Sequence, residues 1–355
     1  MERKIRVLIV DDSAFIRCFL SDLIQETEDL EVAAVAPDPT KALRYLKEQT
    51  IDVITLDVEM PNMDGLEFLR YLMKFHPKPV LMISSWTHTN SELAVKALAL
   101  GAIDCVGKPV IGFREGMEKL KTEIITKIRV AAQAHVSKNS LVSLPSRQAS
   151  EHAFPVSAGT GLEITTDKVI VIGASTGGTV ALTEIFKELH PQVPGIIVIQ
   201  HMSAMFTPSF ASSLQQASHL RVHEAKDGEQ ILAGQALVVP GGKSLTIKKS
   251  GAKYHTIIAP PLKDSIYNPS INHTFNSVAL VAGRNAMGII LTGMGDDGAE
   301  GLRAMRENGA YTIAQDEKTS VIYGMPQKAW EKGGAVKQIP LERISSEIHL
   351  WAGLK

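Results

Sequence analysis

A serine near the middle of the chain stands in a context suited to nucleophilic chemistry. The run from Val169 to Gly178 combines a β-branched strand, a turn of small residues and the start of a helix. Gly173, Ser175 and Gly177 fit the pattern G-x-S-x-G, which exposes a serine beside helix N–H groups that can stabilise an oxyanion. Glycine turns after strands also bind phosphate in dinucleotide folds, so the motif alone leaves both chemistries open.

The following strands favour the nucleophilic interpretation. A dinucleotide site expects an acidic residue after the second strand, but residues 195–200 are followed by His201. We expect His201 to lie beside Ser175 at one sheet edge, where it can act as general base. Asp296 and Asp297 follow a later strand; either can orient the histidine or cap the next helix, and spacing does not choose between them. The order serine, histidine, aspartate differs from that of α/β-hydrolases.

A second group of polar residues follows strands in the N-terminal part. Asp11 and Asp12 come after the first strand, Asp57 ends the third, Ser84 ends the fourth and Lys108 follows the fifth. Such positions meet at one edge of a parallel sheet. Three carboxylates repel one another unless a cation lies among them, and an all-oxygen site suits Mg²⁺. Each residue alone could be a cap or a turn residue, but together they predict phosphorylation of a carboxylate.

Both groups require parallel sheets to position them. Short β-branched runs alternate with amphipathic stretches, and the predicted core strands are residues 5–10, 31–36, 52–57, 79–84, 103–107, 168–172, 195–200, 236–239, 288–292 and 311–315. Residues 245–258 predict an antiparallel hairpin attached to the second sheet. Residues 135–167 lack a hydrophobic period and predict a linker. We therefore predict two doubly wound α/β domains, residues 1–134 and 168–355.

The composition excludes several classes of protein. A net charge of −1 over 355 residues gives no field for binding nucleic acid, and the apolar runs are too short for membrane insertion. Cys18 and Cys105 are the only cysteines, so neither a disulfide framework nor a thiolate zinc site is expected. The first residues contain no apolar signal core, which predicts a cytoplasmic location.

The N-terminal group carries a family resemblance. Its motifs resemble those of the receiver domain of two-component response regulators: Asp11-Asp12-Ser13, Asp57 with Met60-Pro61, Asp64-Gly65, Ser84-Ser85 and Lys108-Pro109. The resemblance implies a flavodoxin-like fold and phosphorylation of Asp57. It also implies Mg²⁺ held by Asp11, Asp12, Asp57 and the carbonyl of Glu59, with Ser84 and Lys108 as phosphate partners. Position 105 differs from the family pattern, because many receivers carry an aromatic switch residue where this chain has Cys105. We expect Cys105 to be a small buried residue of the strand.

The whole chain resembles the chemotaxis protein-glutamate methylesterases, on Gly-Ala-Ser-Thr-Gly-Gly, Gln-His-Met and Thr-Gly-Met-Gly-Asp-Asp-Gly. The resemblance implies Ser175 as nucleophile, His201 as general base and Asp297 as the orienting carboxylate, with Thr176 and Met294 lining the oxyanion region. The substrates of this family are glutamate γ-methyl esters on methyl-accepting chemoreceptors, and many members also deamidate receptor glutamines. The resemblance further implies a chemotaxis histidine kinase as partner. The family's Pro-Ser motif is present, but Asn272 stands where members usually carry Asp, so its role stays open.

The resemblance also implies a switch, in which the unphosphorylated receiver covers the catalytic face and phosphorylation of Asp57 loosens that packing. The sequence leaves two other output classes open. The second domain could bind a partner or nucleotide without chemistry, or it could bind DNA. The DNA-binding alternative is disfavoured because the C-terminal half alternates strands and helices and has no evident helix-turn-helix or basic recognition helix.

Overall fold

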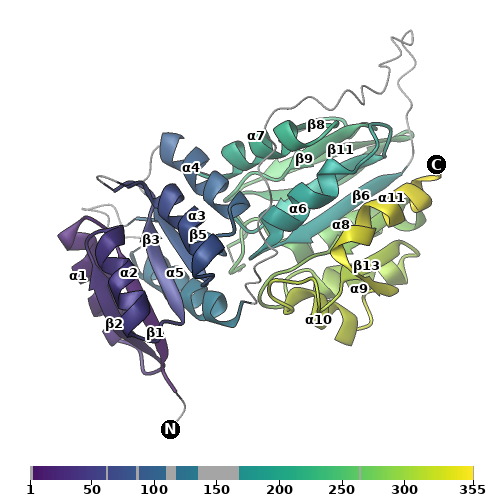
Figure 1. Ribbon diagram of the computed structural model, residues 1–355. Helices are drawn as coiled ribbons and strands as arrows, with labels where there is room; N and C mark the ends of the chain where they lie inside the picture. Colours follow the sequence, from purple (N-terminus) through teal and green to yellow (C-terminus); the bar gives the residue numbers. More distant parts are fainter. Residues whose placement is uncertain are drawn as a thin grey trace.

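A computed structural model of the chain describes residues 3–60, 63–84, 88–108, 117–134, 168–263 and 265–354. Two α/β units lie side by side in it (Figure 1). The predicted linker, residues 135–167, lies outside the described residues, as do Pro61, Ser85 and Pro109. Among the described residues, no helix combines the length and hydropathy that crossing a bilayer would take.

The N-terminal unit is a five-stranded sheet with helices on both faces. Its elements are β1 (Ile5–Val10), α1 (Ala14–Gln25), β2 (Leu30–Ala36), α2 (Pro39–Glu48), β3 (Val53–Asp57), α3 (Gly65–Phe75), β4 (Val80–Ser84), α4 (His88–Ala99), β5 (Asp104–Gly107) and α5 (Met117–Gln133). The strands are parallel in the order β2-β1-β3-β4-β5, the doubly wound order of flavodoxin-like folds. All five strands predicted from the sequence are present, so this fold prediction is confirmed.

Side-chain caps start three of these helices. Ser13 caps α1 and accepts from the N–H of Ile16, while Asp38 and Asp64 cap α2 and α3 in the same way. These side chains satisfy helix N–H groups that would otherwise lack partners. Since Ser13 is the cap of α1, the preceding Asp12 is not needed for that structural role.

The C-terminal unit is built on a seven-stranded parallel sheet in the order β14-β13-β12-β6-β7-β9-β8. Its elements are β6 (Val169–Ala174), α6 (Gly178–Lys187), β7 (Gly195–Gln200), α7 (Thr207–Ala217), β8 (Arg221–Glu224), β9 (Gln235–Val238), β10 (Ser244–Ser250), β11 (Lys253–Ala259), α8 (Ile271–Ala282), η1 (Gly283–Asn285), β12 (Ala286–Ile290), α9 (Ala299–Glu307), β13 (Tyr311–Gln315), α10 (Met325–Glu331), β14 (Lys337–Ile339), η2 (Leu341–Arg343) and α11 (Ile344–Ala352). The predicted hairpin is β10 and β11, which form a sheet of their own. Strands β8 and β14 were not predicted.

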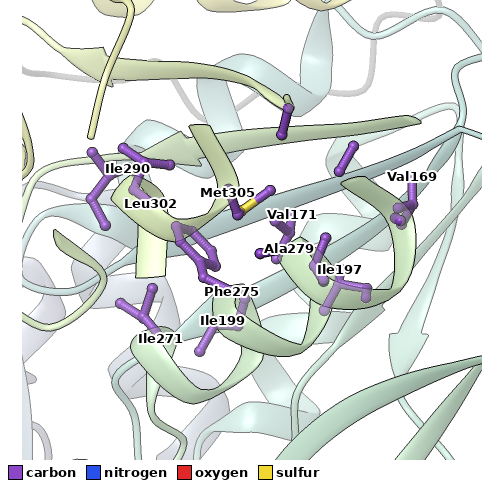
Figure 2. Packing of buried hydrophobic residues seen from close by; sticks show 14 of the residues in the cluster. Val169, Val171, Ile197, Ile199, Ile271, Phe275, Ala279, Ile290, Leu302 and Met305 are labelled. Atoms are coloured by element: carbon purple, nitrogen blue, oxygen red, sulfur yellow. The ribbon is translucent and has the colours of Figure 1, made fainter. Parts of the chain in front are cut away.

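Both faces of the larger sheet are buried, as expected for parallel strands covered by helices. Alternate residues of β6 contribute to opposite clusters: Val169 and Val171 to one, Ile170 and Ile172 to the other. Figure 2 shows the first cluster, in which side chains of β6 and β7 face the apolar sides of α8 and α9. The core therefore fixes the strand ends from which the candidate functional residues project.

The two units share an interface built on α4. Helix α4 lies against α6 and α7 (Figure 1). Val95 of α4 belongs to a core cluster of the C-terminal unit, and Phe206, just before α7, belongs to a cluster of the N-terminal unit. The hydroxyls of Ser91 and Ser209 form a buried hydrogen bond of 2.9 Å across the same contact. Each unit thus completes part of the other's apolar packing.

Candidate active site and acidic cluster

Ser175 and His201 lie at the ends of neighbouring strands. Ala174 of β6 is in register with Gln200 of β7, and the two candidate residues come directly after them. The backbone N–H of His201 donates to the carbonyl of Ala174 at 3.1 Å, and the side-chain amide of Gln200 donates to the carbonyl of Ser175 at 2.8 Å. The structure therefore brings together the serine and histidine that the sequence paired.

The turn around Ser175 depends on close backbone approaches. A Cβ on Gly293 would lie 2.6 Å from the Cβ of Ser175, so this position leaves no room for a larger residue. Ser175 donates its N–H to the carbonyl of Thr292 at 3.0 Å. Gly177 adopts a φ of 79°, in the left-handed region that favours glycine, and is the N-cap of α6. Ser175 consequently precedes a helix N-terminus, where backbone dipoles favour developing negative charge.

Asp297, and not Asp296, pairs with the histidine. Nε2 of His201 lies 2.8 Å from Oδ2 of Asp297, and both side chains are largely buried. Asp296 is exposed and faces Lys332 at 3.7 Å. Because a carboxylate only accepts, Nε2 carries the hydrogen of this bond. Nδ1 of His201 is buried and has no hydrogen-bond partner within the part of the chain that the structure describes, so it is the ring nitrogen available to accept a proton from another group.

The N-terminus of α8 holds Asp297 in its ionised form. The N–H groups of Ile271 and Asn272 donate to the carboxylate at 2.8 and 2.9 Å, and the hydroxyl of Ser270 donates at 3.2 Å. Burial acts to raise the pKa of Asp297, but His201 and these backbone donors outweigh it and hold the pKa below its usual value. A lasting negative charge is thereby fixed beside the imidazole.

The side chain of Asn272 has a structural role that the sequence left open. Its Oδ1 accepts from the N–H of Gly301 in α9 at 2.8 Å, while its own N–H reaches Asp297. A Cβ on Gly301 would lie 3.1 Å from the Cα of Asn272, so the two helices are in close contact here. Asn272 therefore joins α8 to α9 directly behind the carboxylate.

Thr176 and Met294, predicted to line the oxyanion region, occupy different environments. Met294 is partly exposed. Thr176 is buried, and its carbonyl accepts from the hydroxyl of Thr292 at 3.0 Å. The hydroxyl of Thr176 donates to Oδ2 of Asp104, a residue of the N-terminal unit, at 2.9 Å. The N-terminal unit thus contacts the residue next to Ser175, a contact that no sequence pattern indicated.

The predicted acidic cluster forms at the carboxyl ends of β1 and β3. Asp11 and Asp57 are buried, Asp12 is exposed, and the three offer oxygens that lie within 4.8 Å of one another. Nζ of Lys108 lies 2.7 Å from Asp57 and 2.9 Å from Asp11. The N–H of Glu59 donates to Asp57 at 3.4 Å. This set of hard oxygen donors fits a small divalent cation, as a receiver domain requires.

Burial and repulsion make this cluster electrostatically strained. Burial, together with the charge of Asp11, raises the pKa of Asp57 to about 6, although Lys108 opposes the shift. Burial likewise raises the pKa of Asp11. Two buried acids facing one lysine favour the arrival of a further cation.

The neighbouring residues also occupy the predicted places. Ser84 is buried at the end of β4, and its carbonyl accepts from the N–H of Lys108 at 2.7 Å. Gly65 begins α3 so close to Asp57 that a Cβ would lie 2.0 Å from the Asp57 carbonyl oxygen. Cys105 is a small buried strand residue, as expected, and burial raises the pKa of its thiol.

Comparison with known proteins identifies the family. The family model described as CheB methylesterase matches residues 170–348, and the model of the response regulator receiver domain matches residues 7–121. A Geobacter metallireducens protein named protein-glutamate methylesterase/protein-glutamine glutaminase 1 is 47% identical over 349 residues, covering 98% of this chain and 96% of its own. This chain belongs to the CheB methylesterase family.

Other relatives support the same family assignment. A Salmonella typhimurium protein named protein-glutamate methylesterase/protein-glutamine glutaminase is 44% identical over 347 residues, covering 97% of this chain and 96% of its own. The crystal structure of the Thermotoga maritima CheB methylesterase catalytic domain matches with a TM-score of 0.50 and 34% identity, covering 52% of this chain and 97% of that one. The resemblance and the two-domain α/β fold predicted from the sequence are therefore confirmed, with a receiver domain preceding the CheB methylesterase domain.

Proposed function

We propose that this chain is a phosphorylation-activated serine esterase of chemotactic adaptation. Its substrates are γ-methyl esters of glutamate on methyl-accepting chemoreceptors, hydrolysed to glutamate and methanol, and it also deamidates receptor glutamines. The observation that carries the proposal is the buried pair of His201 and Asp297 beside Ser175. Family membership supports the same activity, because the relatives are named for both reactions.

The chemistry follows from the hydrogen bonding of the site. Ser175 Oγ attacks the ester carbonyl carbon while Nδ1 of His201, the nitrogen not bound to Asp297, takes its proton. Asp297 stabilises the imidazolium that forms. The carbonyl oxygen gains negative charge near the start of α6, in the region lined by Thr176 and Met294.

Collapse of this intermediate completes the cycle. The carbonyl re-forms, the C–O bond breaks, and His201 returns the proton to the leaving oxygen, so methanol departs and an acyl-enzyme remains. Water then attacks the acyl-enzyme, with His201 again accepting the proton, and glutamate is released. With a glutamine side chain the leaving group is ammonia, and every later step is the same.

The receiver supplies the control. Asp57 is the proposed phosphoacceptor, with a chemotaxis histidine kinase as the physiological phosphodonor. Mg²⁺, held by Asp11, Asp12, Asp57 and the Glu59 carbonyl, would neutralise phosphoryl oxygens when bound. Lys108 and Ser84 hold the phosphoryl group on Asp57. We place the protein in the cytoplasm, where the kinase and the receptor signalling domains reside.

The coupling between the two sites runs through β5. Asp104 begins this strand and accepts from Thr176, and Lys108, directly after the strand, binds Asp57. Phosphorylation of Asp57 draws Lys108 to the new phosphate, which alters the far end of the same four-residue strand. We infer a receiver of residues 1–134, a linker of residues 135–167 and a catalytic domain of residues 168–355, with the receiver packed over the catalytic face before phosphorylation.

A methanol-release assay tests the proposal. Membranes that carry methylated receptors are incubated with the full-length protein, with and without a small-molecule phosphodonor. We expect release that the phosphodonor stimulates, no release by Ser175→Ala, and unstimulated basal release by Asp57→Asn. Release by Ser175→Ala at the wild-type rate would overturn the nucleophile assignment. Absence of any release would favour a non-catalytic, partner-binding output domain.

A further inference from the structure

The imidazole of His201 is stacked against a phenol ring. The rings of His201 and Tyr267 have centroids 4.3 Å apart and planes 3° apart, a parallel stack. The ring edge carries the bond from Nε2 to Asp297. One face and one edge of the imidazole are therefore held by two residues from separate loops, while Nδ1 keeps no partner among the described residues.

The phenol is fixed in place by its own loop. The hydroxyl of Ser265 donates to the carbonyl of Tyr267 at 2.6 Å and accepts from its N–H at 3.2 Å. Asn268 binds the backbone of Leu262 on both its N–H and its carbonyl. The phenol oxygen lies over Gly295, where a Cβ would be only 2.9 Å from it. These contacts hold the phenol ring in a fixed position, against which the His201 imidazole packs.

We propose that Tyr267 is a positioning residue for the general base: its ring face holds the His201 imidazole in plane and stabilises the imidazolium formed during acyl transfer. The inference rests on the proposed function of His201. With the Nε2 hydrogen bond as its one restraint, the imidazole could still turn about its Cβ–Cγ bond, and the parallel phenol ring restricts this rotation. The electron-rich face of a phenol attracts a cation more than a neutral ring, so the stack is strongest when His201 is protonated.

The charges around the pair support this assignment. Asp297 hydrogen-bonds His201, and Asp296 lies on the same turn but is exposed. Asp104, from the receiver, reaches the neighbouring Thr176. Burial, together with the charges of Asp297 and Asp296, raises the pKa of Tyr267, so its phenol stays neutral over the pH range in which the enzyme works. The ring therefore contributes through its face and not through a titrating hydroxyl.

Steady-state kinetics of the full-length, phosphodonor-treated protein test the inference. Tyr267→Leu removes the ring, and Tyr267→Phe retains it without the hydroxyl. For Tyr267→Leu we expect kcat to fall about 3- to 30-fold with little change in KM, the range expected for losing a cation–π contact. The acid limb of kcat should move to lower pH, because an imidazolium without the aromatic face is less stable and loses its proton more readily. Tyr267→Phe should recover most of the lost activity and the original limb.

Two outcomes would overturn the inference. One is wild-type kcat and an unmoved acid limb in Tyr267→Leu; the other is a Tyr267→Phe variant as impaired as Tyr267→Leu. If Tyr267→Leu folds poorly, NMR of the His201 imidazole protons in Tyr267→Phe and in the parent protein provides the test. A stacked aromatic ring shifts these resonances upfield in both proteins, so resonances without this shift would overturn the inference. Ser175→Ala run in parallel separates the two levels: if the parent releases no methanol, the proposed function fails, and only with an active parent does the Tyr267 comparison decide.

Discussion

The hydrogen bond between Asp104 and Thr176 makes a sharp prediction about basal activity. It crosses from the receiver to the residue next to Ser175 and has a length of 2.9 Å. Asp104 is also bound to Lys127 at 3.0 Å, which holds its carboxylate in place. Asp104→Ala removes the interdomain acceptor and leaves every residue of the catalytic domain in place.

The magnitude follows from the kind of bond. A hydrogen bond with a charged partner contributes about 1.5 to 3 kcal/mol, which corresponds to about 10- to 150-fold in the equilibrium between packed and released receiver. The contact of Ser91 with Ser209 and the apolar packing of Val95 and Phe206 remain. We therefore expect the basal rate of Asp104→Ala to rise about ten-fold, toward the rate of the phosphorylated enzyme and not beyond it.

The assay is methanol release without phosphodonor, followed by its stimulation. Asp29→Ala is the matched control, because Asp29 pairs with Arg129 at 2.7 Å on the receiver surface and takes no part in the interface contacts described above. An exposed pair of this kind contributes little to stability. An Asp104→Ala protein with unchanged or reduced basal activity would refute the reasoning, and an equal rise in Asp29→Ala would indicate general loosening of the receiver.

Two further predictions concern Gly293 and His349 of the catalytic domain. Gly293→Ala should lower activity about 100-fold or more in the methanol assay, because its Cβ would lie 2.6 Å from the Cβ of Ser175; unchanged activity would contradict the close approach. His349 accepts from the N–H of His190 at 3.0 Å, and burial, with the charge of His190, lowers its pKa. Its neutral form is thus the stable one: stability is full above the unfolded pKa of about 6.5 and declines as pH falls below it. Denaturation at pH 8 and pH 5.5 should show this loss in the wild type and a smaller one in His349→Gln.

The sequence predicted the central strands well because they are buried on both faces and appear as continuous apolar runs. Some predicted strand boundaries differ from the observed ones by one or two residues. Strand β12, for example, is Ala286–Ile290, whereas residues 288–292 were predicted. The two strands that were not predicted, Arg221–Glu224 and Lys337–Ile339, are the outermost strands of the larger sheet. Edge strands are short and partly exposed, so they carry too few apolar residues to produce a signal.

The site was predictable to the extent that its residues follow strands directly. Ser175 and His201 do so, and strand adjacency placed them together. The choice between Asp296 and Asp297 depends on the start of α8, which local spacing does not reveal. Tyr267 lies in an irregular loop with no periodic pattern. No sequence pattern indicated the contact between Asp104 and the other domain either, since a polar residue at the start of a strand is common and carries no signal of a partner.

Asn272 offers a test of how α8 holds the Asp297 carboxylate. Asn272→Ala removes the acceptor of the Gly301 N–H and leaves a buried donor without a partner, which should lower the free energy of unfolding by about 1 to 3 kcal/mol. Asn272→Asp keeps an acceptor. Its new charge repels Asp297, but near a helix N-terminus it also gains about 0.3 to 1 kcal/mol, so the two effects largely cancel. Chemical denaturation should therefore rank wild type and Asn272→Asp within about 1 kcal/mol of each other and Asn272→Ala below both; equal losses in both variants would show that repulsion from Asp297, and not the bond to Gly301, dominates at this position.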